Sequence, residues 1–323
     1  MSDIKKCICT VLLISYNHEP YIRTAIESVL NQKTKYKYKI HIFDDASIDR
    51  SAEIAKDYVD KYPEKVFLFS SDKNKGAQEN IWNAYKSVDT KYCCLLETDD
   101  YWCDDLKLDL QIEALEINED CSFCSHLTKI ININDEYRQN ENGIIDIINK
   151  KILESEKISI DDIKAESVGT GYMNSALSRL IRFSSIDLSE IKFKEAFLWD
   201  NCQFYYLLLK GKMYFINRVM GVYCMTGAGV YSGNKPLLRL EKFIDAHIQF
   251  NKETNYAIGD RIFREIVSHT NYYLWLLENH NKVIPIKEDR SSIIRNMKNV
   301  IKLFLPPIFI LFYKFCKQLV FKI

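Results

Sequence analysis

Four short apolar runs, each bounded by polar residues, divide the first 120 residues of the chain. They cover residues 8–14, 40–43, 66–69 and 92–96 and are rich in Val, Ile, Phe and Cys. Between them, apolar residues recur at helical spacing: Ile22, Ile26, Val29 and Leu30; then Ile54, Ala55, Tyr58 and Val59; then Ile81, Ala84, Tyr85 and Val88. Buried strands that alternate with amphipathic helices predict βαβ units. We therefore expect an α/β fold with a mainly parallel sheet flanked by helices.

The regular pattern ends near residue 120. Residues 130–165 are rich in Asn, Ile, Lys and Asp and lack a clean period, which predicts an insertion or lid. Further elements are expected in this order: a helix over 201–210 that ends at Gly211, strands at 213–216 and 219–223, a glycine-bearing loop at 226–233, and a helical region from 236 to about 280.

The last 34 residues, 290–323, contain seven Lys or Arg and no acidic residue. Within them, residues 303–313 are apolar around a Pro-Pro pair, and beyond it one helical face is apolar while the opposite face carries Lys and Gln. This is typical of a helix that lies in a membrane interface, where anionic lipid favours the excess positive charge. The alternative is a final helix packed on the domain. No apolar run reaches the roughly 20 residues of a membrane-spanning helix.

Composition and charge exclude several classes of protein. With 323 residues, 47% hydrophobic and 27% charged, the chain is long and apolar enough to bury a sizeable core. The 44 basic and 44 acidic residues cancel, which argues against nucleic-acid binding by bulk positive charge. Ten cysteines, several within apolar runs, predict free core thiols in a reducing, cytosolic compartment. The single CxxC pair, Cys121 and Cys124, lacks the second pair of a zinc site.

Polar residues follow each predicted strand, where open parallel sheets bind their ligands. In the order of the sequence they are Ser15 and Tyr16; Asp44 and Asp45; Lys75 and Gly76; and Glu97, Asp99 and Asp100. Taken singly, the acidic pairs also fit helix caps or turns. Their occurrence at two consecutive strand ends favours a binding site with a negative edge.

This edge has a specific chemical use. A carboxylate such as Asp45 can accept the N3–H of a uracil-type base, while Tyr16 supplies a flat apolar surface. Glu97 and Asp99 can hold a divalent cation, Mn²⁺ or Mg²⁺, that keeps open positions for diphosphate oxygens. Because acidic residues cannot bind phosphate directly, the metal is required.

Five segments resemble family-2 glycosyltransferases with the GT-A fold. They are residues 10–17 (TVLLISYN), 26–32 (IESVLNQ), 42–47 (IFDDAS), 74–76 (NKG) with Asn80, and 96–102 (LETDDYW) leading to Lys107 and Leu108. The likeness is dense over about 8–125 and thinner to about 232. It implies a Rossmann-like GT-A domain over 1–234, with a nucleotide-sugar half (1–125) and an acceptor half (126–234). Residues 235–323 would form a helical C-terminal extension with the basic tail.

The resemblance also implies roles for particular residues. Ser15, Tyr16 and Asp45 would bind the nucleotide sugar, with Asn80 and the turn at Lys75 and Gly76 nearby. The stretch from Glu97 to Asp99 falls where the family has its DxD motif, and Asp99 would contact the metal. Glu97 replaces the usual first Asp and would act directly or through water. Asp100 would cap the next helix or orient the acceptor.

A carboxylate must also take the proton of the acceptor hydroxyl. Asp200 matches the family's acceptor-side catalytic carboxylate, although an N-cap of the following helix is the structural alternative, and Glu195 is the second candidate. Cys224 and Thr226 stand where relatives often carry a basic residue and a His. His18 lies beside the predicted nucleotide pocket, where we interpret it as a residue of a surface turn and not as an acid or base, and we interpret His41 as structural.

The resemblance implies an inverting, metal-dependent hexosyltransferase-type enzyme. It would move a sugar from a nucleoside-diphosphate donor, UDP-linked, to an acceptor hydroxyl. The basic tail favours a lipid-linked oligosaccharide or other glycan of a bacterial surface polysaccharide as acceptor, with peripheral membrane contact through 303–323 at the inner face of the cell membrane. A sugar nucleotidyltransferase and a non-catalytic, membrane-docked binding subunit with the same fold are the alternatives.

Overall fold

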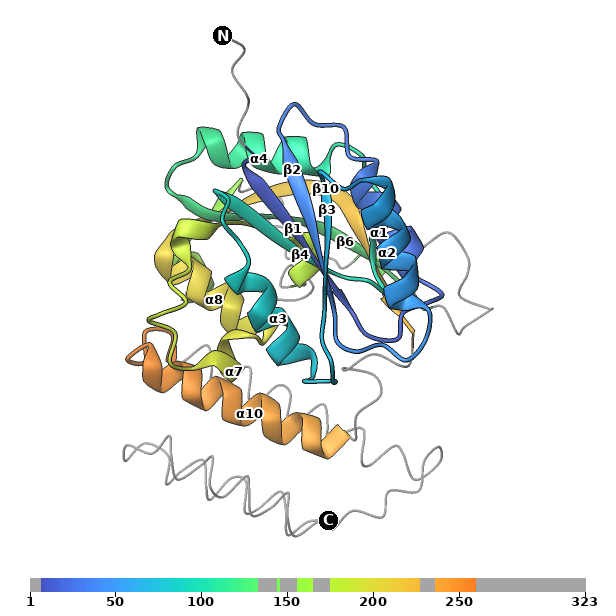
Figure 1. Cartoon of the computed structure of the whole chain (residues 1–323). Coiled ribbons are helices and arrows are strands. Elements are labelled where there is room, and N and C mark those ends of the chain that lie inside the picture. Colours follow the sequence, from blue (N-terminus) through green and yellow to red (C-terminus); the bar gives the residue numbers. More distant parts are fainter. Residues whose placement is uncertain (1–6, 133–143, 146–155, 165–174, 227–235, 260–323) are drawn as a thin grey trace.

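A single sheet with helices on both faces forms the centre of the molecule (Figure 1). The computed structural model describes residues 7–132, 144–145, 156–164, 175–226 and 236–259. The strands are β1 (Cys9–Ser15), β2 (Tyr38–Asp44), β3 (Val66–Ser70), β4 (Tyr92–Glu97), β5 (Tyr101–Trp102), β6 (Cys121–Asn132), β7 (Ile144–Ile145), β8 (Lys157–Ile158), β9 (Leu180–Arg182) and β10 (Lys212–Met225). The α-helices are α1 (Ile22–Leu30), α2 (Ser51–Lys61), α3 (Ala77–Lys86), α4 (Lys107–Ile117), α6 (Ile160–Lys164), α7 (Lys194–Phe197), α8 (Asp200–Lys210) and α10 (Pro236–Glu253).

The strand order confirms the expected α/β fold. Most strands lie along the path β3-β2-β1-β4-β9-β6-β10-β5, while β7 pairs with β6 and β8 with β10. The first four strands along this path are parallel. The short β9 is antiparallel to both β4 and β6, and β10 is parallel to β6. The carboxyl ends of β1, β2, β4, β6 and β10 therefore point to the same edge of the sheet.

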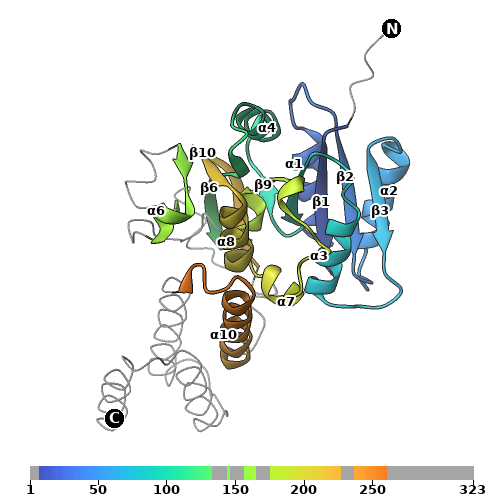
Figure 2. The same cartoon turned by 90° about the vertical axis from the view of Figure 1, so that its left-hand side faces the viewer.

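The alternation of apolar residues along β1 assigns the helices to two layers (Figure 2). Val11 and Leu13 lie in a core shared with α1, α2 and α4, whereas Leu12 and Ile14 lie in a second core shared with α3, α7, α8 and α10. All four of these β1 side chains are buried. Because both faces are covered, the parallel strands are continuous apolar runs, as the sequence predicts.

Two strands differ from the prediction. The pattern beyond residue 120 gave no strand before 213, yet β6 begins at Cys121 and pairs with β10 along its length. The predicted strands at 213–216 and 219–223 are instead one strand, β10, with register shifts on either side of Val219. As expected from the sequence, Cys121 and Cys124 are buried free thiols.

Helix α8 ends at Gly211, as predicted, but the reason is close packing rather than a left-handed turn. Gly211 has an extended backbone with φ 174°. A Cβ atom there would lie 3.0 Å from the carbonyl oxygen of Asp120 and from the amide nitrogen of Ser122. The side chain is therefore excluded by the neighbouring strand.

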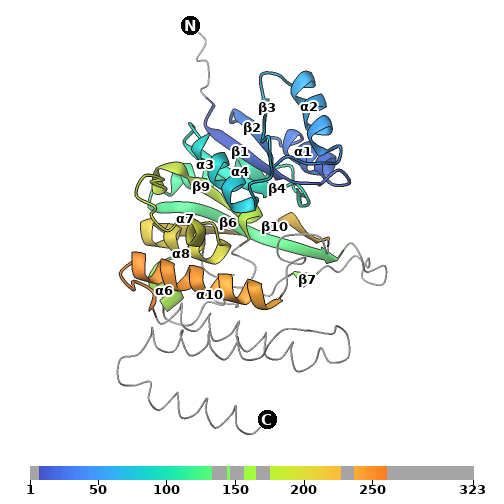
Figure 3. The same ribbon diagram turned by 60° about the horizontal axis from the view of Figure 1, so that its bottom comes forward.

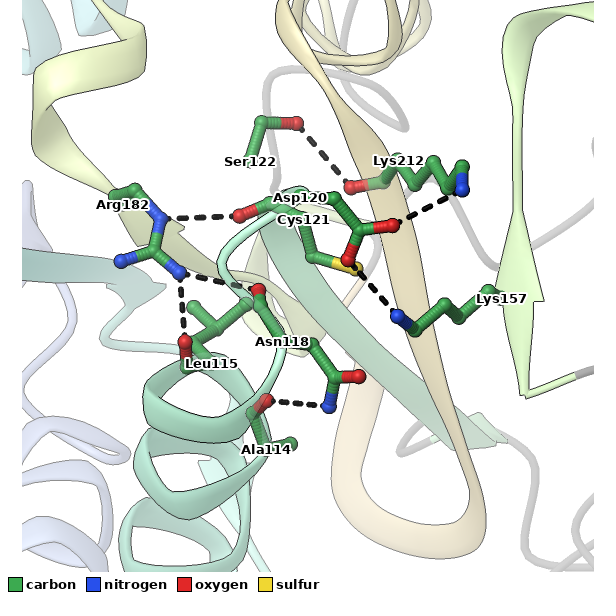
Figure 4. Close-up of polar contacts among 9 residues, drawn as sticks. All are labelled: Ala114, Leu115, Asn118, Asp120, Cys121, Ser122, Lys157, Arg182 and Lys212. Atoms are coloured by element: carbon green, nitrogen blue, oxygen red, sulfur yellow. Dashed lines mark hydrogen bonds and ion pairs between the residues drawn. The ribbon is translucent and has the colours of Figure 1, made fainter.

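Ion pairs fasten the amino ends of β6 and β10 together, at the edge opposite the polar strand ends (Figure 4). Asp120 pairs with Lys157 at 2.8 Å and with Lys212 at 2.9 Å, and these two ammonium groups lower the pKa of Asp120 to about 2. Arg182 donates to the carbonyl oxygens of Leu115 and Cys121 at 2.6 and 3.0 Å. These contacts stabilise the fold at this end of the sheet.

Helix α10 packs against α7 and α8 on the outer side of the second layer (Figure 3). Its position confirms the start of the helical region predicted from residue 236. The remainder of that region, the tail at 303–323, and most of the predicted lid and glycine-bearing loop lie outside the described residues. Among the helices that are described, none combines the length and the apolar character needed to cross a bilayer.

Candidate active site

The loops that follow β1 and β2 are joined by hydrogen bonds at the carboxyl edge of the sheet. The amide of Asp45 donates to the carbonyl oxygen of Ser15 at 3.0 Å. The amide of Asn17 donates to the Ser47 hydroxyl at 2.9 Å. Asn17 and Ala46 both have left-handed backbones, with φ 54° and 58°. Such a conformation is costly for alanine, so these contacts hold the two loops in a strained arrangement.

Asp45 organises the loop that follows β3. Its two carboxylate oxygens accept the backbone N–H groups of Lys75 and Gly76, at 2.9 and 2.8 Å. Gly76 has a φ of 88°, a conformation that favours glycine. The Asp45 side chain is buried. Since a carboxylate offers about four lone-pair positions, Asp45 retains capacity for a further donor such as a base N–H.

The other residues predicted to bind the nucleotide sit around Asp45 in different settings. Tyr16 is 41% exposed, as a stacking platform requires. The buried hydroxyl of Ser15 has no hydrogen-bond partner among the described residues. Asn80 is also buried and donates to the Phe43 carbonyl oxygen at 2.9 Å, which supports the end of β2 that carries Asp45.

Glu97, Asp99 and Asp100 form an acidic cluster at the end of β4. One carboxylate oxygen from each lies within 4.8 Å of the others. The amide of Thr98, between them, donates to the Ile14 carbonyl oxygen at 2.9 Å, so the cluster adjoins the end of β1. Burial, followed by the charges of Asp99 and Asp200, raises the pKa of Glu97 to about 8. Burial also raises the pKa values of Asp99 and Asp100.

Asp100 does not cap the next helix, contrary to one of the two roles predicted for it. The residue before α4 is Leu106, and the amide of Leu108 in the first turn of α4 donates to Gln32 Oε1 at 3.0 Å. Instead the buried Asp100 carboxylate accepts the backbone N–H of Cys224 in β10 at 2.7 Å. Asp100 therefore joins the acidic cluster to the carboxyl end of β10. There burial raises the pKa of the Tyr223 phenol, and the charges of Glu97, Asp100, Asp99 and Asp200 add to this shift.

Asp200 is the first residue of α8 and lies within electrostatic reach of the cluster. Its charge contributes to the raised pKa of Glu97. Asp200 is exposed at one side, but desolvation of its carboxyl by the surrounding protein raises the pKa of that group. The charge of Arg179 and a 3.4 Å contact from the Ala176 amide act in the opposite direction. Glu195 is exposed on α7 and is not among the charges that act on Glu97.

No local sequence pattern indicates the role of Arg179. Its guanidinium is fully buried and donates to the Asp200 carbonyl oxygen and to Gln203 Oε1, both at 2.9 Å. Gln203 in turn donates to the Tyr85 hydroxyl at 3.0 Å. This chain of hydrogen bonds, from Arg179 through Gln203 to Tyr85, holds the first turn of α8 in place. It also places a positive charge near Asp200, which favours the ionised carboxylate.

His18 lies in the loop after β1, and its ring adjoins Thr98 and Asp99 at the end of β4. Its Nδ1 is 2.8 Å from the Thr98 hydroxyl, and its Nε2 is 3.9 Å from an oxygen of Asp99. Burial lowers the pKa of the imidazole, while the charges of Asp99, Asp49 and Asp44 oppose that shift. No local pattern could reveal these contacts, because Thr98 is 80 residues away in the chain.

The cluster has the donor set and the electrostatics of a hard-cation site. Carboxylate oxygens are the preferred protein ligands of Mg²⁺ and suit Mn²⁺. Burial raises the pKa values of all three carboxyls, and the charges of neighbouring carboxylates add to the shift at Glu97 and Asp100. At Asp99 the charge of His18 opposes the shift. A divalent ion would stabilise their ionised forms. Asp99 and Glu97 are the residues that would hold it, since Asp100 already accepts the Cys224 amide.

The raised pKa of Glu97 predicts a pH-dependent stability for the metal-free protein. A group whose pKa rises from 4.5 unfolded to about 8 folded stabilises the fold below pH 4.5, and this contribution is lost as pH rises toward 8. The melting temperature of the wild-type protein should fall from pH 5 to pH 8, and this decrease should be smaller in Glu97→Gln. Saturating Mn²⁺ should restore more stability at pH 8 than at pH 5. Identical pH trends in the two proteins would contradict the assignment.

The fold and this acidic edge define the class of protein. The structure matches that of TarS from S. aureus (residues 1–349) in complex with UDP-GlcNAc, with a TM-score of 0.65 and 16% sequence identity over 92% of this chain and 82% of that chain. The UDP complex of the same TarS fragment gives a TM-score of 0.63, also at 16% identity, over 92% of this chain and 81% of that one. The fold is thus the GT-A fold, as predicted.

The sequence comparison defines the family. Residues 10–186, more than half of the chain, match the profile described as Glycosyl transferase family 2, and the chain belongs to this family. An uncharacterized protein of Mycobacterium bovis is 33% identical over 122 residues, which are 38% of this chain and 35% of that protein. The putative teichuronic acid biosynthesis glycosyltransferase TuaG of Bacillus subtilis is 30% identical over 118 residues, 36% of this chain and 45% of TuaG. The chain thus matches less than half the length of these curated relatives.

Proposed function

We propose that the chain is a metal-dependent glycosyltransferase that moves a sugar from a UDP-linked donor to a hydroxyl of a bacterial cell-surface glycan, with inversion at the anomeric carbon. The observation that carries the proposal is the group of carboxylates Glu97, Asp99 and Asp100, with ligand oxygens within 4.8 Å of one another beside the end of β1. Membership of family 2 supports the reaction class.

In this proposal the donor lies along the carboxyl edge of the sheet. Ser15, Tyr16 and Asp45 bind the uridine, and the loop at Lys75 and Gly76, held by Asp45, lines the same side. Asp99 and Glu97 would hold the cation, whose positive charge would stabilise the negative charge that develops on the diphosphate leaving group. Residues 1–234 form the catalytic domain, whose halves at 1–125 and 126–234 handle donor and acceptor, and 235–323 form the C-terminal extension.

Asp200 is the proposed general base. Its carboxylate takes the proton of the acceptor hydroxyl while that oxygen bonds to the anomeric carbon and the bond to the diphosphate breaks. The nearby charge of Arg179 favours the ionised carboxylate that this step requires. Asp200 is on α8, a different element from the nucleotide-binding loops, and its charge acts on Glu97 of the acidic cluster, which suits an acceptor-side role.

The acceptor class is proposed from relatives. TuaG is named for teichuronic acid biosynthesis, and a teichoic acid poly(glycerol phosphate) polymerase of Staphylococcus epidermidis is 29% identical over 91 residues, 28% of this chain and 12% of that protein. We extend this to a cell-surface polysaccharide acceptor met at the inner face of the membrane, with contact through 303–323. Deletion of 303–323 should then move the protein from the membrane pellet to the supernatant; unchanged partition would refute this contact.

A panel of nucleotide sugars with Mn²⁺ tests the reaction class. A glycosyltransferase slowly hydrolyses its own donor, so the expected result is release of UDP from one UDP-sugar of the panel, dependent on the metal. Release of pyrophosphate on incubation of UTP with sugar phosphates would indicate a sugar nucleotidyltransferase instead. Binding of a nucleotide sugar with no release of product, even when glycan acceptors are added, would indicate a non-catalytic binding subunit.

A further inference from the structure

The ring of His18 is held rigidly beside the acidic cluster. Its backbone amide donates to the Ser51 hydroxyl at 2.8 Å, and its carbonyl oxygen accepts the amides of Tyr21 and Ile22 at 2.9 and 2.8 Å. The loop at the end of β1 is therefore fixed on both sides of the residue. The side chain is 21% exposed, and that of Asp99 is 13% exposed, so both border solvent.

The Thr98 hydroxyl can accept a proton from His18 Nδ1. The hydroxyl oxygen is 2.8 Å from Nδ1 and 3.1 Å from the Ile14 carbonyl oxygen, which can take the hydroxyl's own proton. In the tautomer that carries this Nδ1–H, the lone pair of the neutral imidazole is on Nε2, the atom that faces Asp99.

The distance between the two facing atoms fits a shared cation better than a direct bond. His18 Nε2 and Asp99 Oδ2 are 3.9 Å apart, which is too far for a hydrogen bond. In an octahedral site with ligand bonds of about 2.1 Å, adjacent ligands are about 3.0 Å apart and opposite ligands about 4.2 Å. The observed separation lies between these values.

We propose that His18 Nε2 is a nitrogen ligand of the divalent cation that Asp99 holds, an inference that rests on the proposed function. The Nδ1–H···Thr98 contact is the second hydrogen bond that metal-binding histidines generally make, and it fixes the ring orientation. A nitrogen ligand also favours Mn²⁺ over Mg²⁺, because Mg²⁺ prefers oxygen ligands. The site would therefore discriminate between the two ions.

Pulsed EPR of bound Mn²⁺ tests the proposal. With UDP present, the wild-type protein should show imidazole ¹⁴N coupling, and protein labelled with ¹⁵N-histidine should show the ¹⁵N coupling instead. His18→Gln should lose the signal and bind Mn²⁺ about 10–100-fold more weakly, the range for perturbed metal sites. His41→Gln is the matched control: His41 bonds to the Ser87 hydroxyl at 2.9 Å and packs on Phe67 and Phe69, so the coupling should persist.

The outcomes separate this inference from the proposed function. If Mn²⁺ binds in a manner that depends on Asp99 but no histidine nitrogen couples to it, His18 is not a ligand, and the metal-dependent transferase stands. A signal that persists in His18→Gln overturns the inference equally. If the wild-type protein with UDP binds no Mn²⁺, both the inference and the proposed metal site fail. The labelled wild-type protein gives its answer even if His18→Gln does not fold.

Discussion

Replacement of Asp200 by Asn is expected to lower the rate of sugar transfer by about 10²–10⁴-fold, the usual contribution of a general base, while Mn²⁺-dependent UDP binding is retained. The amide cannot accept the acceptor proton, but it is nearly the same size and leaves the nucleotide-binding loops untouched. The measurements are kcat with the cognate acceptor and the Kd of UDP by calorimetry.

Glu195→Gln provides the matched control for Asp200→Asn. Glu195 is exposed five residues earlier in the chain, so its loss should leave kcat within about two-fold, as for an ordinary surface change. The raised pKa of Asp200 adds a pH signature: since the base must be ionised, kcat/KM should fall as pH falls through a pKa above the ordinary 3.8. Loss of activity in Glu195→Gln but not in Asp200→Asn would reverse the assignment.

Replacement of Asp99 by Asn should remove most of the metal-dependent nucleotide affinity. In the proposal the Asp99 carboxylate is a charged ligand of the cation, and an uncharged amide is a weaker ligand. Mn²⁺ affinity should fall at least 10–100-fold, about the effect of losing even an outer partner of a metal ligand. Titration of Mn²⁺ in the presence of UDP measures this change, and the stimulation of UDP binding by Mn²⁺ should disappear with it.

Asp105→Asn is the control for Asp99→Asn. Asp105 lies in the same stretch of chain and its carboxylate is 44% exposed, but it pairs with Lys33 at 2.5 Å and is not part of the acidic cluster. The same loss of charge at this position should leave Mn²⁺ and UDP binding unchanged. Equal effects of the two substitutions would mean that net charge, and not coordination at Asp99, determines nucleotide binding.

The nucleotide-binding half was predictable because its signals are local. The strands around Val11, Ile42 and Leu95 are apolar runs buried on both faces, and such runs alternate with helices in a way that few other folds produce. The strand order places Asp45 and Asp99 at one edge, because parallel strands end on the same side.

Strand β6 could not be predicted in the same way, because polar residues interrupt it. Ser122 and Ser125 are buried in this strand, and their hydroxyls are satisfied by partners distant in sequence: the Leu207 carbonyl oxygen at 2.6 Å and the Ser178 hydroxyl at 2.8 Å. Without those tertiary contacts the segment has neither the alternation nor the apolar run of a strand.

The acceptor side of the site depends on contacts between distant segments. The sequence suggests Asp200 by resemblance alone, and it indicates neither the buried Arg179 beneath it nor the link from Asp100 to the Cys224 amide. The same limit applies to His18, because its contacts with Thr98 and Asp99 are visible only in the folded structure. Pairings of this kind arise from topology and leave no local pattern.

Anomalous diffraction from crystals grown with UDP and Mn²⁺ tests the central claim most directly. We predict one manganese peak within bonding distance of an Asp99 oxygen and of the UDP diphosphate, with the uracil against Tyr16 and its N3–H directed at Asp45. Nucleotide bound away from the ends of β1, β2 and β4, or bound there with manganese remote from Asp99, would contradict the account.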